Sequence, residues 1–507
     1  MFREFLWGVS ISGFQFEMGD PEGLSVDPNS DWFVWVHDEA NVSSGVVSGD
    51  LPEDGPNYWF LFAEDHRLAQ DMGMNAFRIG IEWSRLFPKP TRGVRVDYEL
   101  DSRGLIAHVD IGEEHLLELD RLANKSAIRR YREIVRDLRD RGFKVIVNLN
   151  HFTLPIWIHD PIKARDTRLK RGPLGWLDRE SVVEFAKYAA YVAWKLGDLV
   201  DVWSVFNEPN IVAIKGYLVP SGFPPGVADH NAYIRANVNM AVAHARAFDA
   251  IKKFDRVRAD SESPSAAVVG LIHNITPAYP LDPGNARDVV AARNFSYVYN
   301  EWFLNAVVNG ELDEDLDGET GPQSRVHHLR GKVDWIGVNY YTRCVLRAAE
   351  SKRPPSLLAS FEIVEGYGRL CEPRSRSRAG LPTSDFGWEV YPKGLYDSIE
   401  ICLKYGKPIL VTENGVADEG DVLRPSFIVE HVRVLEEVRK AFNVAGYLHW
   451  SLIDNYEWAH GFRMKFGLFG VDFRSKKRIP RRSAFVFKEI AENNGVTESL
   501  LAKYSHL

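Results

Sequence analysis

The chain has 507 residues, of which 45% are hydrophobic and 26% charged, a composition typical of a globular protein that can bury a large core. Its net charge of -8, without a tract of lysine and arginine, argues against nucleic acid as a partner. The three cysteines, Cys344, Cys371 and Cys402, are scattered, which indicates neither a disulfide framework nor a cysteine metal site and favours a reducing compartment.

An apolar strand pattern begins at Phe5, which leaves no room before it for a signal peptide. No apolar run elsewhere in the chain reaches the length of a membrane span. We therefore expect a cytoplasmic protein with no membrane partner.

An amphipathic helix, a glycine and a short apolar strand then follow one another repeatedly. This order is found at helix 61–72 with Gly73 and strand 76–81, helix 128–138 with Gly142 and strand 143–149, helix 182–196 with Gly197 and strand 200–206, and helix 395–405 with Gly406 and strand 409–412. Further strands are expected at 5–9, 267–272, 335–338 and 444–448. Eight strands that alternate with helices predict an α/β fold, a single (β/α)8 TIM barrel domain over residues 1–507.

Two stretches interrupt this pattern, at about 91–126 and 347–384. Both are long and polar and contain glycine or proline, so we interpret them as loop insertions in the same domain. Residues 481–507 are expected to form a last helix and a C-terminal tail. A doubly wound open sheet is the alternative fold, but no glycine-rich dinucleotide fingerprint follows any strand, and we expect no cofactor.

Polar and aromatic residues follow the predicted strands, and in a barrel these positions converge on one pocket. They are Arg78 and Glu82, Asn150 and His151, Asn207 and Glu208, Asn339 and Tyr341, Glu413 and Asn414, and Trp450, with Glu457 and Trp458 shortly after it. Two glutamates presented in this way, Glu208 and Glu413, suit glycoside hydrolysis, in which one carboxyl group protonates the leaving oxygen and another attacks or activates water. We interpret Glu82 as structural.

No phosphate-binding loop, zinc-binding helix or nucleophile elbow competes for this pocket. His327-His328 is a candidate metal pair, but no carboxylate or cysteine stands at ligand spacing from it. We interpret the pair as part of a solvated loop and expect no metal site.

The stretches Phe206-Asn207-Glu208-Pro209 and Thr412-Glu413-Asn414-Gly415 resemble the two signatures of glycoside hydrolase family 1, the retaining β-glycosidases. The resemblance runs nearly from end to end and includes the stretches 14–15, 78–85, 337–341, 449–452 and 454–458. In length and in the stretch 221–226, the chain most resembles the enzymes of hyperthermophilic archaea.

The resemblance implies a role for each matching position. Glu413 matches the nucleophile and Glu208 the acid/base, while Arg78 and Tyr341 match the pair that contacts the nucleophile and would favour its ionised form. The positions that match the sugar-binding groups are Asn207 for the 2-hydroxyl, Gln15, His151, Glu457 and Trp458 for other hydroxyls, Trp450 as the stacking floor, and Asn339 as a further lining residue.

Phe152 departs from the family pattern, because most members have tryptophan after the histidine. A phenyl ring cannot donate a hydrogen bond, and archaeal members that favour β-mannosides share this His-Phe pair. The resemblance therefore implies an exo-acting β-glycosidase of the β-glucosidase type with β-galactoside and β-mannoside activity. The alternatives are a β-mannosidase, a transglycosylating β-glycosidase and a catalytically silent scaffold.

The resemblance also bears on partners. The carboxylate of Glu457 stands where 6-phospho-β-glycosidases have a small residue, and it would repel a phosphate. Glu208 stands where thioglucosidases have lost the acid. The expected partner is a small β-glycoside or β-linked oligosaccharide, and the archaeal relatives imply a homo-oligomer, either dimer or tetramer.

Overall fold

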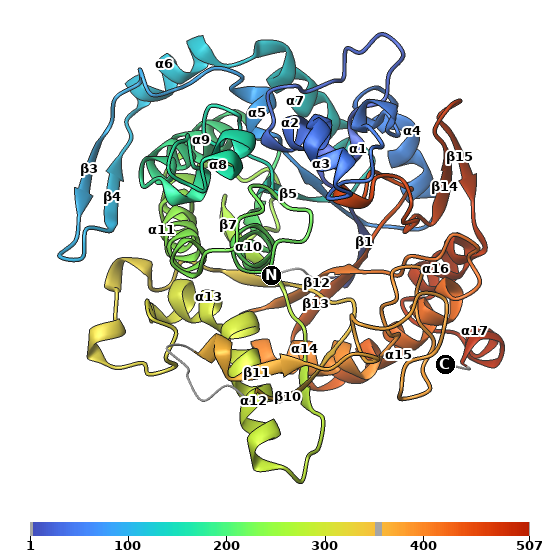
Figure 1. Ribbon diagram of the computed structural model, residues 1–507. Coiled ribbons are helices and arrows are strands. Elements are labelled where there is room, and N and C mark those ends of the chain that lie inside the picture. The colour runs from blue at the N-terminus through green and yellow to red at the C-terminus, as the bar shows by residue number, and fades with distance from the viewer. Residues whose placement is uncertain (1–3, 350–356, 506–507) are drawn as a thin grey trace.

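Eight strands form a closed barrel at the centre of the molecule in a computed structural model that describes residues 4–349 and 357–505 (Figure 1). They are β1 (Leu6–Ser10), β2 (Ala76–Gly80), β5 (Lys144–Asn150), β6 (Val202–Asn207), β7 (Val268–Asn274), β9 (Trp335–Asn339), β12 (Ile409–Asn414) and β13 (Val444–His449). Neighbours pair in parallel in the order β1, β13, β12, β9, β7, β6, β5, β2, and β2 pairs with β1 to close the ring. The predicted (β/α)8 barrel and its eight strands are confirmed.

The barrel interior is filled by apolar side chains, to which every strand contributes. They are Leu6, Ala76, Ile146, Val202, Val268, Ile272, Trp335, Leu410 and Leu448. Side chains of this kind make the centre of such a barrel a packed core rather than a channel. The functional pocket therefore has to lie at an end of the barrel.

Helices surround the barrel and cover its outer face (Figure 1). The long ones are α4 (Tyr58–Asp71), α7 (Lys125–Asp140), α9 (Glu180–Leu196), α11 (His230–Phe254), α12 (Ala286–Ser296), α14 (Lys393–Leu403), α15 (Arg424–Ala441) and α16 (Arg482–Asn493). Shorter ones are α1 (Gly13–Phe16), α2 (Asp31–His37), α3 (Glu39–Ser43), α5 (Trp83–Leu86), α8 (Pro161–Asp166), α10 (Pro209–Ala213) and α13 (Trp302–Leu304). The predicted helices correspond to α4, α7, α9 and α14.

The glycines that follow the predicted helices do not all act alike. Gly73 has φ of 72°, the left-handed conformation that ends many helices. Gly197 after α9 has φ of -60°, and a Cβ atom there would lie 2.5 Å from Oδ1 of Asp255. Gly197 is therefore required for close packing and not for its backbone conformation.

The first predicted insertion, 91–126, is not a loop. It contains the antiparallel strands β3 (Asp97–Leu100) and β4 (Ile106–Asp110) and the helix α6 (Glu113–Leu122). The hairpin lies at the periphery of the molecule (Figure 1), and every residue of β3 is exposed. The apolar pattern that marks a strand depends on a buried face, which β3 lacks.

The second predicted insertion, 347–384, overlaps a small sheet in which β10 (Cys344–Ala348) pairs with β8 (Ala278–Pro280) and β11 (Phe361–Ile363). Part of that prediction, 350–356, lies outside the described residues. The C-terminal prediction was also incomplete, because a second helix, α17 (Glu498–Tyr504), follows α16. A last hairpin, β14 (Phe469–Asp472) with β15 (Lys477–Pro480), precedes α16.

Within 4–349 and 357–505, no helix is long and apolar enough to cross a membrane.

Candidate active site

A pocket opens at the carboxyl ends of the barrel strands, where Glu208 directly follows β6 and Glu413 is the penultimate residue of β12. The predicted site residues that line it are Gln15, His151, Phe152, Asn207, Glu208, Tyr341, Glu413, Trp450, Glu457 and Trp458. The remaining two, Arg78 and Asn339, are fully buried and hydrogen-bond to lining residues. The chain therefore brings all the predicted positions together.

Glu413 is held between two donors. Arg78 donates from Nη1 to Oε1 at 2.6 Å, and the Tyr341 hydroxyl donates to Oε2 at 2.6 Å. The side chains of Arg78 and Glu413 are 0% and 4% exposed, so this ion pair is shielded from water. The predicted contacts with the nucleophile position are present.

The pKa of Glu413 reflects opposing effects. Burial raises the pKa of Glu413 to about 7; Arg78 lowers it, Glu208 raises it, and the Tyr341 hydrogen bond lowers it. Arg78 and Tyr341 thus act in the predicted direction, but burial outweighs them. The carboxyl group is poised between its two forms near neutral pH.

Replacing Arg78 with methionine is expected to move the acidic limb of the kcat/KM pH profile upward by about one unit or more. The carboxyl group of Glu413 stays buried but loses its cation, so its pKa rises further above about 7. Attack requires the ionised form, and the loss of rate at pH 6 should therefore exceed the loss at pH 8. Arg78→Lys keeps the charge and serves as the control. A uniform loss at every pH would contradict this role.

Glu208 is positioned by neutral donors. Asn274 and Asn339 each donate from Nδ2 to its Oε1 at 2.8 Å. Its backbone has φ of 48° and donates from N to the Ile272 carbonyl at 2.9 Å. A positive φ at a non-glycine residue is strained and persists where the surroundings fix it, often in active sites. Among the described residues no hydrogen bond reaches Oε2, which leaves that oxygen for a ligand in the pocket.

Asn207 and Asn339 connect the two carboxyl groups. Oδ1 of Asn207 accepts from Nη2 of Arg78 at 2.8 Å and from Nδ2 of Asn339 at 3.0 Å. Because Arg78 also contacts Glu413 and Asn339 also contacts Glu208, one chain of hydrogen bonds fixes both glutamates. The Nδ2 group of Asn207 faces Nε2 of His151 at 3.1 Å.

A second polar group lies across the pocket, where Gln15 donates to Oε2 of Glu457 at 3.2 Å. Burial raises the pKa of Glu457 to about 8, against the effect of Lys215. Burial and Arg78 hold the pKa of His151 well below its usual value, so its imidazole is neutral. Neutral or poised groups of this kind can exchange hydrogen bonds with sugar hydroxyls without a large desolvation cost.

Aromatic rings form the apolar part of the pocket. The imidazole of His151 is stacked with Trp450 and with Trp458, at centroid distances of 5.9 and 5.8 Å. The centroid of the Phe152 ring lies 4.9 Å from that of Trp458 and 5.2 Å from that of Phe223. Trp450 and Trp458 add aromatic surface to the lining of the pocket, which suits contact with the apolar face of a sugar ring.

Sequence reasoning missed several lining residues, namely Ile211, Lys215, Phe223, Asn274, Arg369, Trp388 and Phe466. Asn274 ends β7, so the rule that placed the other strand-end residues would have found it. Arg369 orients Asn274, because Nη2 donates to Asn274 Oδ1 at 2.7 Å while Asn274 donates to Glu208. Arg369 lies in the predicted polar insertion, where no periodic signal marks it.

The side chain of Glu82 does not line the pocket. It accepts hydrogen bonds from the backbone N of Phe14 at 2.9 Å and from the Thr153 hydroxyl at 2.6 Å. Burial raises its pKa to about 8. It links α1 to the segment after β5 and lies outside the residues that line the pocket.

The chain is similar to known glycosidases over nearly its whole length. The glycosyl hydrolase family 1 model matches residues 1–100 and 121–496. A β-galactosidase of Pyrococcus woesei is 51% identical over 506 residues, which cover 99% of each chain. The internal stretch left unmatched, 101–120, falls within the first predicted insertion.

Solved structures give the same result. The β-glycosidase of Thermosphaera aggregans has a TM-score of 0.90 and 45% identity and covers 100% of this chain and 99% of its own. A β-glucosidase mutant derived from a hyperthermophilic tetrameric structure has a TM-score of 0.88 and 44% identity, with 100% and 98% covered.

Proposed function

The chain belongs to glycosyl hydrolase family 1 and is a glycosidase that hydrolyses O-glycosyl compounds, and we propose that it acts as an exo-acting, retaining β-glycosidase. One observation carries the proposal. Two glutamates share a pocket but have different hydrogen-bond donors. Glu413 accepts from a guanidinium and a phenol, whereas Glu208 accepts from two amides. Partners this different suit two different tasks, nucleophile and proton donor.

In the first step Glu413 attacks the anomeric carbon as the bond to the leaving oxygen breaks. Glu208 gives its proton to that oxygen, and a sugar ester of Glu413 with inverted configuration results. Asn207 is hydrogen-bonded to Arg78 and Asn339, which contact Glu413 and Glu208 in turn, and from there it would reach the 2-hydroxyl.

In the second step a water molecule takes the place of the leaving group. Glu208 removes a proton from it, its oxygen attacks the anomeric carbon, and Glu413 departs as a carboxylate. The second inversion restores the β configuration.

The proposal is tested with chromogenic β-glucoside, β-galactoside and β-mannoside, and by proton NMR of the anomer first released. We expect turnover of all three glycosides and a β anomer as the first product. Release of the α anomer would overturn the retaining mechanism, and turnover of α-glycosides alone would overturn the β specificity. Product analysis at high sugar concentration measures transglycosylation.

The preferred glycone is the finer part of the proposal. The names of the relatives, β-galactosidase and β-glucosidase, support activity on galactosides and glucosides. Phe152 favours β-mannosidase as the second candidate, because its phenyl ring lines the pocket without a donor to a glucose hydroxyl.

Phe152→Trp is expected to raise the glucoside-to-mannoside ratio of kcat/KM by roughly 2- to 12-fold, the effect of one hydrogen bond of about 0.5–1.5 kcal/mol. Phe152 is only 6% exposed, so the larger indole must displace Phe223 and should also cost about 1–3 kcal/mol of stability. Phe152→Leu is the matched control, since it changes the packing without adding a donor. An equal ratio in the tryptophan and leucine variants would contradict the assignment.

We also propose that the enzyme is a cytoplasmic homo-oligomer, a dimer or a tetramer. The relative derived from a tetrameric structure supports the assembly, and three free cysteines, two of them buried, fit a reducing compartment. Light scattering during gel filtration measures the state, and a monomer at micromolar concentration would contradict it.

A further inference from the structure

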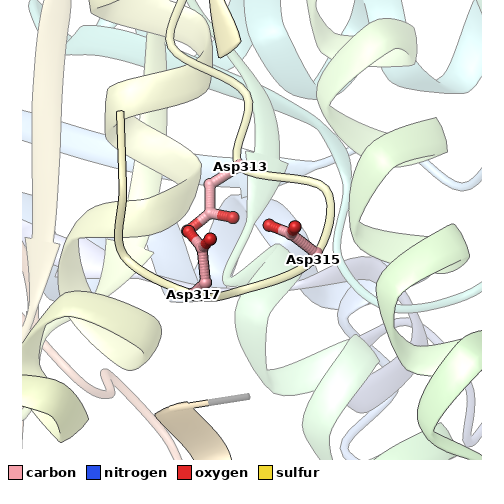
Figure 2. Close-up of side chains that lie close together, drawn as sticks. All are labelled: Asp313, Asp315 and Asp317. Atoms are coloured by element: carbon pink, nitrogen blue, oxygen red, sulfur yellow. The ribbon is translucent and has the colours of Figure 1, made fainter. Parts of the chain in front are cut away.

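Three aspartates converge on one loop outside the active-site pocket. The loop, 313–324, is closed at its base by a hydrogen bond from the Leu312 N to the Ser324 carbonyl at 2.7 Å. Figure 2 shows Asp313, Asp315 and Asp317 pointing toward one another, and one oxygen of each lies within 4.8 Å of the others. We call these three residues the aspartate cluster.

Asp313 is the buried member, with 2% of its surface exposed. Its Oδ2 accepts from the Tyr297 hydroxyl at 2.8 Å and from Gly318 N at 2.9 Å. Its Oδ1 is also buried but has no hydrogen-bond partner among the described residues. A buried carboxylate oxygen without a donor costs free energy, and this carboxylate is turned toward the other two (Figure 2).

No basic side chain offsets the charge of the aspartate cluster within 4–349 and 357–505. Arg103 approaches the same loop, but it forms its ion pair with Glu314 at 3.4 Å. A cation placed between the three groups would relieve both the repulsion and the unpaired oxygen.

The sequence of the loop, Asp313-Glu314-Asp315-Leu316-Asp317-Gly318, is the order found at the start of calcium-binding loops. Gly318 has φ of 80°, as the sharp turn in such loops requires. The twelfth position is Ser324 instead of the usual glutamate, so the site offers fewer charged ligands. The expectation of no metal site depended on histidine and cysteine spacing, and so left this loop out.

We propose that the aspartate cluster binds one calcium ion, separately from the catalytic pocket. Carboxylate oxygens are the ligands that calcium prefers, at bonds of about 2.3–2.6 Å, so two ligands of one ion lie at most about 4.6–5.2 Å apart. The three oxygens all lie within 4.8 Å of one another, so one ion can reach all of them. With three carboxylates and no bidentate glutamate, we expect a dissociation constant on the order of 10⁻⁴–10⁻³ M. The ion would fasten the loop to Tyr297.

Terbium luminescence tests the site, because Tb³⁺ replaces Ca²⁺ and is excited by nearby aromatic rings. Trp302 donates from its indole N to the Asp313 carbonyl at 2.6 Å, and Tyr297 contacts the Asp313 carboxylate, so both rings can sensitise the ion. We expect one Tb³⁺ per chain, competition by Ca²⁺, and at least a 10-fold loss of emission in the double variant Asp315→Asn/Asp317→Asn.

The matched control is Asp97→Asn/Asp110→Asn, which removes the same charge from an exposed pair on the β3–β4 hairpin. Emission that persists in the cluster variant, or that is lost equally in the control, would overturn the proposal. Thermal unfolding gives a second measurement: 5 mM CaCl₂ should raise the Tm of the wild type and not that of the cluster variant. In EDTA the variant should be at least as stable, because it lacks the repulsion.

Discussion

Glu413→Gln is expected to lower kcat by at least about 10⁴-fold on every glycoside, because the neutral amide cannot attack the anomeric carbon. The substitution keeps the size of the side chain, and the amide can still face Arg78 and Tyr341. It leaves the buried guanidinium of Arg78 without its counter-ion, so some stability is also lost. Circular dichroism and calorimetric titration with a disaccharide must therefore accompany the kinetics.

The control is Glu184→Gln. Glu184 is 3% exposed and paired with Lys187 at 2.7 Å, so this variant also removes one partner of a buried ion pair, at a distance from the pocket. We expect it to lose stability and to retain turnover once folded. A folded Glu413→Gln variant that binds sugar but does not cleave it excludes the scaffold alternative. Retained turnover would remove Glu413 from the mechanism.

Glu208→Ala should lower kcat/KM by a factor that depends on the leaving group of the substrate. An alkyl glycoside needs a proton on its departing oxygen, and its kcat/KM should fall by about 10²–10⁴-fold. A 2,4-dinitrophenyl glycoside needs none, so its first step should be nearly unaffected and the sugar ester of Glu413 should accumulate as a burst. An equal loss on both substrates would contradict the role of Glu208.

Azide distinguishes the roles of the two glutamates in a second way. It needs no general base, so it should restore turnover in Glu208→Ala and yield the β-glycosyl azide. In Glu413→Ala the same anion would occupy the place of the nucleophile and yield the α-glycosyl azide. Proton NMR distinguishes the α-glycosyl azide from the β-glycosyl azide. If each variant gave the product expected of the other, the roles of Glu208 and Glu413 would be the reverse of those proposed.

The barrel could be predicted because its strands are buried on every side and therefore read as continuous apolar runs. Val202–Asn207 is an example, with all of its residues buried. The β3–β4 hairpin could not be predicted in this way, because β3 is exposed throughout and is not a continuous apolar run. The second C-terminal helix, α17, is a short element, and its N-cap residue Thr497 is the local signal for its start.

The pocket was predictable to the extent that a residue's place in a strand fixes its direction. Arg78, Asn207 and Glu413 belong to barrel strands, and the fold alone brings them together. Lys215 lies on a π-helical turn, Ile214–Leu218, and Arg369 lies on an irregular segment after β11. The course of both depends on tertiary packing that no local sequence pattern records. The raised pKa of Glu413 could not be predicted for a related reason. Motifs indicate which side chains contact the carboxyl group, but they do not indicate how deeply it is buried.

The hydrogen bond between Gln15 and Glu457 joins residues 442 positions apart. Gln15 follows β1 and Glu457 follows β13, and these two strands pair in the barrel. The proposed glycone subsite therefore combines residues that are far apart in the sequence. During synthesis the first of these residues leaves the ribosome long before the second exists, and the ring of strands stays open in the meantime. Activity on glycosides therefore requires that synthesis has passed Glu457. A segment with β1 and a segment with β13, if made separately, would have to associate before either could cleave a glycoside.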